Sequence, residues 1–211
     1  MLCTIYRAAA GAFTVFAVAM QYGLLVRYET LNGLGVSSIK FFSFFTILAN
    51  LLAAAALLVP LIAPRSSLGQ FLARPSVRTA IAGYIIMVAT IYYLLLRDLS
   101  QRQGWPLYFE RTLHYVTPPL FVLDWALFVT KREVHWSVGF ASLEFPLAYV
   151  GWTLIHGAMS GWYPYPFIDV AELGYPRALV NVAGLIAIYL ALVAALVAVG
   201  RRIGPQTDGS A

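Results

Sequence analysis

Long runs of apolar residues, separated by short polar segments, occupy most of this 211-residue chain. A helix needs about twenty mostly apolar residues to cross the hydrocarbon core of a bilayer. Six stretches approach that length, namely residues 7–28, 36–61, 79–96, 109–129, 137–155 and 178–199. The pattern therefore predicts an all-α, polytopic membrane protein built as a bundle of six transmembrane helices.

Composition supports a membrane protein, because the chain is 61% hydrophobic and only 11% charged. The connections between the predicted spans are too short for a soluble catalytic domain, so we expect one transmembrane domain over residues 1–203 and a disordered tail over 204–211. The first span has no clear small-residue cleavage site and is interpreted as a retained helix. Cys3 is the only cysteine, which excludes an internal disulfide and a cluster of thiolate metal ligands.

The basic residues near the span ends indicate how the chain is oriented. With both termini in the cytoplasm, eight of them lie inside (Arg7, Arg65, Arg74, Arg78, Lys131, Arg132, Arg201 and Arg202) and five lie outside (Arg27, Arg97, Arg102, Arg111 and Arg177). This excess predicts cytoplasmic N- and C-termini. The lysines and arginines form no run or patch, so the net charge of +5 does not indicate a nucleic-acid partner.

Polar residues at membrane depth are costly, and each is expected to be paired or functional. The second span contains Lys40, Ser43, Thr46 and Asn50. Ser43, Thr46 and Asn50 follow i, i+3, i+7 spacing and therefore share one face of a continuous helix. The span is thus expected to present a polar stripe, with Thr46 roughly 15 Å below its outer end.

A second polar stripe is predicted in the fourth span, which contains His114, Thr117 and Asp124. His114 is expected roughly 8 Å below the outer end of that span, at a depth compatible with a contact to Thr46. Asp124 lies roughly 15 Å farther along the axis, too far to be the carboxylate of a simple triad. Any group that orients His114 is therefore expected to come from another span.

Each of these polar residues also has a purely structural interpretation. An intramembrane threonine such as Thr46 commonly bonds the carbonyl one turn back, and a buried histidine such as His114 is often a satisfied core residue. Asp124 and Glu144, the latter expected toward the middle of the fifth span, can be paired within the bundle. Lys40 can extend its ammonium group to the outer interface.

Three short segments, in the same order along the chain, resemble motifs of one protein family. They are Phe44-Phe-Thr-Ile-Leu-Ala-Asn-Leu51, Leu113-His-Tyr-Val-Thr-Pro-Pro-Leu-Phe121 and Trp162-Tyr-Pro-Tyr-Pro-Phe167. The family is that of the androgen-induced and androgen-dependent six-pass membrane proteins, and the resemblance extends over nearly the whole chain. The third segment is too rich in proline for a regular helix and is expected to cap the outer mouth of the bundle.

The resemblance implies an intramembrane hydrolase of fatty acid esters of hydroxy fatty acids, with Thr46 as nucleophile and His114 as its base, and without a cofactor. We expect a bacterial-type relative in the cytoplasmic (inner) membrane, with its site toward the outer leaflet and a lipid ester as substrate. This chemistry is coherent, because a threonine hydroxyl is a weak nucleophile that needs an adjacent base. The oxyanion or substrate-positioning donors within sequence reach are Lys40, Ser43, Asn50 and Tyr115.

Other classes of protein fit parts of the pattern. A metal hydrolase could draw on His114, His156, Glu144 and Asp124, but no pair of them has metal-site spacing, and no metal is expected. A small transporter, channel or lipid-binding membrane protein could use Lys40, Asp124 and Glu144 as a polar path, although the chain has no evident internal repeat. A structural or assembly protein would need no polar stripe facing the bundle.

Overall fold

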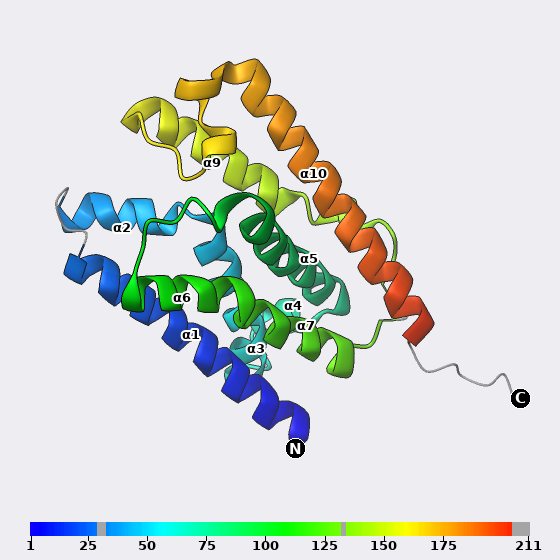
Figure 1. Ribbon diagram of the computed structural model, residues 1–211. Coiled ribbons are helices and arrows are strands. Elements are labelled where there is room, and N and C mark those ends of the chain that lie inside the picture. The colour runs from blue at the N-terminus through cyan, green and yellow to red at the C-terminus, as the bar shows by residue number, and fades with distance from the viewer. Residues whose placement is uncertain (29–32, 132–133, 204–211) are drawn as a thin grey trace, which may run out of the picture.

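The computed structural model describes residues 1–28, 33–131 and 134–203, which form helices and connecting loops without a β-strand. The prediction of an all-α protein is confirmed. In chain order, the helices are α1 (Leu2–Tyr28), α2 (Leu34–Phe42), α3 (Phe45–Ile62), α4 (Ser67–Ala73), α5 (Pro75–Ile91), α6 (Gly104–Tyr115), α7 (Thr117–Phe128), α8 (Val138–Ala141), α9 (Glu144–Ser160) and α10 (Val170–Ile203), with a π-helical turn η2 (Tyr92–Leu96) after α5 and a 3₁₀ turn η3 (Pro166–Ile168) before α10 (Figure 1). Arg132 and the predicted tail 204–211 lie outside the described residues.

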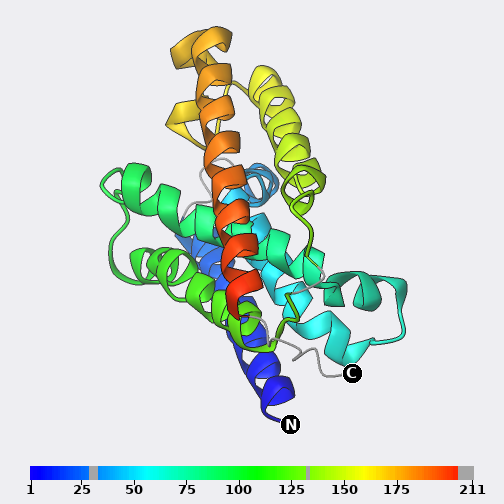
Figure 2. The same ribbon diagram turned by 90° about the vertical axis from the view of Figure 1, so that its right-hand side faces the viewer.

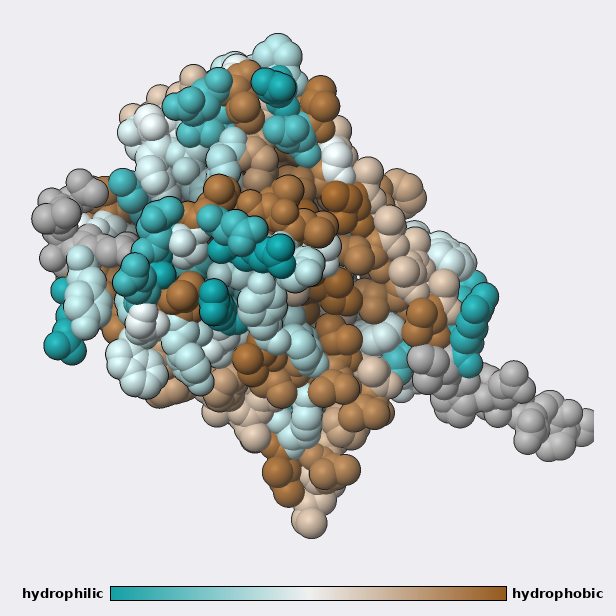
Figure 3. All heavy atoms as spheres, viewed as in Figure 1, coloured by the Kyte–Doolittle hydropathy of each residue, from teal (hydrophilic) through white to brown (hydrophobic). Residues whose placement is uncertain are grey.

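Within the described part of the chain, five helical segments are long and apolar enough to cross a membrane. They are Leu2–Tyr28, Phe45–Ile62, Pro75–Leu96, Val138–Ser160 and Val170–Arg202. Hydrophobic residues cover a broad area right of centre and toward the bottom of the face in Figure 3, whereas hydrophilic residues gather at its top, over its left half and at its right-hand edge. These features are compatible with an integral membrane protein. Each segment overlaps one of the six predicted spans, and the span without a counterpart is the fourth, 109–129.

The predicted fourth span is not continuous, because the chain breaks between α6 and α7. Val116 follows α6 with a hydrogen bond from its N–H to the Thr112 carbonyl, at 3.0 Å, and its backbone is distorted within the helical region, at φ −105° and ψ −51°. Pro118 and Pro119 follow and have no N–H, so the carbonyls one turn earlier receive no helical hydrogen bond from them. The break leaves His114 in the last turn of α6.

The predicted second span is also two helices. Phe44 is extended, with φ −81° and ψ 127°, and separates the end of α2 from the start of α3. Thr46 therefore lies in the first turn of a new helix, whereas the sequence pattern placed it along a continuous one. The polar stripe predicted from i, i+3, i+7 spacing is consequently wrong at Ser43, which precedes the break.

Helices α1, α3, α5, α6 and α7 pack together, and α10 lies against α5 (Figures 1 and 2). The contact with α10 is close, since a Cβ at Gly83 of α5 would come within 2.7 Å of Val193. In both views, α1 begins and α10 ends at the same end of the bundle. Tyr6 packs on Phe128 there, with ring centroids 5.6 Å apart, at the end of α7.

A buried ion-pair cluster ties four helices together near that end. Asp124 of α7 is fully buried and lies 2.6 Å from Arg7 Nε of α1 and 2.5 Å from Arg78 Nη1 of α5. Arg78 also donates to the carbonyl of Ala56 in α3. Arg78 is therefore a buried residue of the bundle, in the first turn of α5. Asp124 has the structural role of a residue paired within the bundle.

Candidate functional site

Thr46 and His114 face each other where α3 passes α6. Thr46 Oγ1 lies 3.1 Å from His114 Nε2, within hydrogen-bonding distance. Both residues are buried, with exposed fractions of 8% and 7%. The structure thus brings together the two side chains that the sequence singles out, at a separation suited to direct proton transfer.

The two helix breaks position these side chains. Because the chain turns at Phe44, Thr46 lies where the first N–H groups of α3 have no intrahelical partner, and where the helix dipole is positive. Because α6 ends at Tyr115, His114 projects from its last turn toward that helix start. The depths expected for continuous spans therefore do not describe the site, which lies at a junction of helix ends.

The contacts of the His114 ring define its tautomer. Nδ1 lies 2.7 Å from the carbonyl oxygen of Glu110, one turn earlier in α6. A carbonyl only accepts, so Nδ1 carries the hydrogen and Nε2 presents its lone pair to the Thr46 hydroxyl. Tyr92 stacks on the imidazole, with ring centroids 3.8 Å apart and planes 17° apart. The expectation that another span orients His114 was wrong for this hydrogen bond, since the partner is a carbonyl of the same helix.

Asn50 is fully buried and joins the start of α3 to the end of α6. Its Nδ2 donates to the carbonyl of Thr46 at 2.8 Å and to the carbonyl of Leu113 at 3.2 Å. Its Oδ1 accepts from the Thr117 hydroxyl. Both amide hydrogens are therefore engaged by carbonyls, and Asn50 positions Thr46 and His114 relative to each other. The expectation that it donates to an oxyanion was wrong for this geometry.

The other three residues expected to donate to the oxyanion or to position the substrate are Ser43, Tyr115 and Lys40, and they lie at different distances from the site. Ser43 is buried against α9, where its Oγ accepts from Trp152 Nε1 at 3.1 Å. Tyr115 follows His114 in the helix and so points to another side, where it is 40% exposed. Lys40 does face the site region, with its Nζ 5.2 Å from the Trp162 ring centroid. Of these three candidate donors, Lys40 lines a cavity at Thr46, whereas Ser43 and Tyr115 do not.

Tyr165 is the residue that sequence reasoning missed. Its hydroxyl lies 3.4 Å from the backbone nitrogen of Thr46 and 3.5 Å from Thr46 Oγ1. It belongs to the proline-rich segment 162–167, for which we expected only a capping role. Burial raises the pKa of Tyr165 above the usual value of a tyrosine, so the phenol stays protonated. Tyr165 belongs to the third of the motifs that carry the family resemblance, but nothing in the spacing of that motif connects Tyr165 with Thr46.

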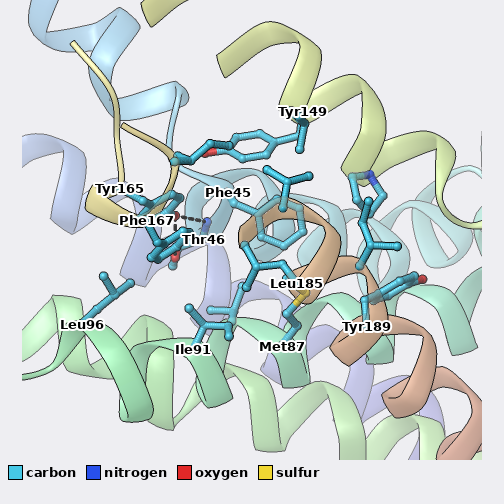
Figure 4. A pocket seen from close by; sticks show the side chains of 16 residues that line it. Phe45, Thr46, Met87, Ile91, Leu96, Tyr149, Tyr165, Phe167, Leu185 and Tyr189 are labelled. Atoms are coloured by element: carbon cyan, nitrogen blue, oxygen red, sulfur yellow. Dashed lines mark hydrogen bonds between the residues drawn. The ribbon is translucent and has the colours of Figure 1, made fainter. Parts of the chain in front are cut away.

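Two cavities meet at Thr46. The larger has a volume of about 860 Å³, and Lys40, His114 and Trp162 are among its lining residues. The smaller, about 70 Å³, is apolar and lies between α3, α5, α9 and α10 (Figure 4). Thr46, Tyr165 and Leu96 line both. Thr46 therefore stands at the boundary between an apolar space and a more polar one.

Asp124 and Glu144, proposed with Lys40 as a polar path, line neither of these cavities. Glu144 is exposed as the first residue of α9, inside the apolar segment Val138–Ser160. His156 stacks on Trp152, with centroids 5.5 Å apart. Among the described residues, no group of three or more His, Cys, Asp or Glu side chains is arranged to hold a metal ion.

Comparison with known proteins gives no match, whether to a protein-family model, a curated protein or a solved structure.

Proposed function

We propose that this protein is an intramembrane threonine hydrolase that cleaves lipid esters, with fatty acid esters of hydroxy fatty acids as the expected substrate class. One observation carries the proposal, namely the 3.1 Å contact between Thr46 Oγ1 and the lone-pair nitrogen of His114. An activated nucleophile needs a base in that position and orientation, and the Glu110 carbonyl supplies the orientation. The resemblance of the three motifs to the hydrolase family supports the same assignment.

In the acylation step, Thr46 Oγ1 forms a bond to the ester carbonyl carbon while its proton moves to His114 Nε2. The carbonyl π electrons move to the oxygen, which becomes an oxyanion. Collapse of this intermediate breaks the bond to the alcohol oxygen, and His114 returns the proton to that leaving group. The products of this step are an acyl-threonine and the free hydroxy fatty acid.

In the second step, water attacks the acyl-threonine and gives its proton to His114. The Thr46–acyl bond breaks, Thr46 Oγ1 regains the proton from His114, and the fatty acid is released. The balance is one ester and one water consumed, with one acid and one alcohol formed. The larger cavity, which contains Gln21, Arg102 and Ser100 among its polar lining residues, gives water a route to the acyl group.

The two cavities suit the two halves of such a substrate. The apolar cavity beside Thr46, lined by Met87, Ile91 and Leu185 among others, can take the end of the acyl chain. The larger cavity has room for the hydroxy fatty acid half, and Lys40 at its wall can attract the carboxylate of that half. Substrate would enter from the bilayer, because the exposed helix faces are apolar.

We also propose a position in the membrane. The α6–α7 pair completes a sixth span alongside α1, and both termini face the cytoplasm of a bacterial inner membrane. In support, α1 begins and α10 ends at one end of the bundle, whereas the larger cavity is lined by Gln21 and Tyr28 near the opposite end of α1. The site would then lie toward the outer leaflet.

The test is hydrolysis by the purified protein of a medium-chain p-nitrophenyl ester and of a fatty acid ester of a hydroxy fatty acid. We expect Thr46→Ala and His114→Ala to lower kcat by at least about 100-fold, because each removes a partner of the proton transfer. Thr14→Ala is the matched control, since Thr14 is a buried threonine that bonds only the carbonyl of Ala10 in its own helix. Thermal unfolding in detergent verifies that each variant is folded.

Two results would contradict the proposal. One is folded wild-type protein that hydrolyses neither ester. The other is hydrolysis that survives in folded Thr46→Ala at the level of Thr14→Ala. A phosphonate ester probe adds a direct check, because it should modify the peptide that contains Thr46 in the wild type and not in His114→Ala.

A further inference from the structure

Attack on an ester carbonyl places negative charge on an oxygen inside the bundle, and that charge needs a preorganised hydrogen-bond donor. Asn50 has both of its amide hydrogens bonded to carbonyls, and Ser43 and Tyr115 line neither cavity at Thr46. Lys40 lines the larger cavity only, with its ammonium group over Trp162. The ester carbonyl would lie at the boundary between the two cavities. None of the donors expected from the sequence lies at that boundary with a free hydrogen.

Tyr165 occupies that boundary. Its hydroxyl is 3.5 Å from the nucleophilic oxygen Oγ1 of Thr46, and Figure 4 shows the two side chains directed toward each other. The oxyanion and Oγ1 are bonded to the same carbon in the tetrahedral intermediate, so a donor beside Oγ1 can reach the oxyanion at the required distance of about 2.7–3.1 Å.

A hydrogen bond that the Tyr165 hydroxyl accepts also prepares it for donation. The backbone N–H of Thr46, in the first turn of α3, donates to the phenolic oxygen at 3.4 Å. A hydroxyl that accepts one hydrogen bond becomes a better donor of the next. Burial raises the pKa of Tyr165, which keeps the donated proton on the phenol.

The ring of Tyr165 is held rigidly, as a preorganised donor must be. Pro164 and Pro166 flank it and restrict the backbone on either side. Its ring stacks on Phe167, with centroids 5.1 Å apart, and meets Phe44 edge to face at 5.7 Å. Phe44 is the extended residue before α3, so the same segment sets the positions of both Thr46 and Tyr165.

We propose that Tyr165 is a catalytic residue whose hydroxyl donates a hydrogen bond to the oxyanion formed when Thr46 attacks the ester. This inference rests on the proposed hydrolase function. In the free protein the phenolic hydrogen is directed to Thr46 Oγ1. As Oγ1 forms its bond to the carbonyl carbon and loses its proton to His114, the phenolic hydrogen turns to the adjacent oxyanion, and it returns when the alcohol leaves.

The test compares Tyr165→Phe with wild type and with Tyr84→Phe, which removes a hydroxyl that is bonded to the Ser142 carbonyl and belongs to a residue lining neither cavity. Loss of one oxyanion donor lowers kcat by about 100- to 1,000-fold, and we expect that loss with KM changed little. Binding of a trifluoromethyl ketone, which forms a tetrahedral adduct with Thr46, should weaken by a similar factor. Binding of an ether analogue of the ester, which has no carbonyl, should be unchanged.

Equal weakening of the ketone and of the ether, or a kcat close to that of Tyr84→Phe, would overturn the inference. If Tyr165→Phe does not fold, fluorotyrosines incorporated at position 165 retain the ring and hydroxyl while varying its acidity. The donor role then requires kcat to change with acidity, and a constant kcat overturns it. If the wild-type protein hydrolyses neither ester, the proposed hydrolase function is wrong. If both the wild type and Tyr165→Phe are active, only the role proposed for Tyr165 is wrong.

Discussion

The carbonyl oxygen of Glu110 accepts a hydrogen bond from His114 Nδ1 at 2.7 Å, and this contact determines which ring nitrogen faces Thr46. In a Ser-His-Asp triad a buried carboxylate has that task and also stabilises the imidazolium that forms. Here the acceptor is a neutral backbone group one turn earlier in the same helix. The orientation of His114 therefore depends on the helical geometry of α6 and on the stacked Tyr92 ring, and within the described part of the chain no carboxylate bonds its Nδ1.

The first prediction concerns the side chain of Glu110, which bonds Ser100 Oγ at 3.0 Å and pairs with Arg102 at 3.6 Å. Glu110→Gln retains the backbone carbonyl, so we expect kcat within about threefold of wild type, as for loss of a partly exposed ion pair. The corresponding amide replacement in a true triad costs about 10⁴-fold. Steady-state kinetics on the p-nitrophenyl ester distinguishes orientation of His114 by the backbone carbonyl from orientation by the Glu110 carboxylate. A loss above about 100-fold would mean that the carboxylate acts in the proton transfer.

Asn50 gives the second prediction. Asn50→Leu removes the donors to the carbonyls of Thr46 and Leu113, so the start of α3 and the end of α6 are no longer tied together. A displacement of about 1 Å between reacting groups can cost about 100-fold in rate, and we expect kcat to fall by about 10- to 100-fold with KM changed little. Asn50→Asp should also lose activity, because a carboxylate cannot donate to those carbonyls. A folded, fully active Asn50→Leu would contradict this positioning role.

Hydropathy predicts where this chain can lie in a membrane, but not where its helices break. The segment after each break is apolar, and the segment before it contains polar residues such as Lys40, Glu110 and Arg111. Each whole run nevertheless has the length of an uninterrupted span. The local signals were Pro118 and Pro119, whose missing N–H groups end a helix ladder whatever their hydropathy. At Phe44 no such residue marks the break, so the local sequence does not predict it.

Two residues of the candidate site, Thr46 and His114, were predictable from the sequence, and the other contacts were not. Thr46 and His114 are polar residues in apolar surroundings, and that contrast is visible in the sequence. The role of the Glu110 carbonyl is not visible in the sequence, because every residue has a backbone carbonyl. Tyr165 lies 119 residues from Thr46 in a loop without periodicity, so neither spacing nor a helical face could place its hydroxyl beside Thr46.

The third prediction tests the structural role of Asp124. Asp124→Asn leaves Arg7 and Arg78 near each other without a compensating charge, and breaking such a buried pair typically costs about 3–5 kcal/mol in the free energy of unfolding. We expect a clear fall in Tm in detergent and unchanged kcat per folded molecule. Glu144→Gln, at an exposed position, should change Tm little. A stable Asp124→Asn variant with altered ion or proton flux in vesicles would instead favour the polar-path function.

The last prediction uses two glycines of α9 that differ only in what surrounds them. A Cβ at Gly157 would overlap the ring of Tyr163, whereas a Cβ at Gly151 would meet nothing within 4 Å. Gly157→Ala must therefore displace the Tyr163 ring. Tyr163 lies two residues before Tyr165, so we expect the segment to shift with it and kcat to fall by at least about 10-fold as the donor moves away from Thr46. Gly151→Ala should leave kcat unchanged and raise Tm slightly, because alanine has the higher helix propensity. Adding Tyr163→Ala to Gly157→Ala restores the space, and recovery of kcat in that double variant would show that the loss came from displacement of the loop. Equal kcat in the two alanine variants would mean that the position of this loop does not limit the reaction.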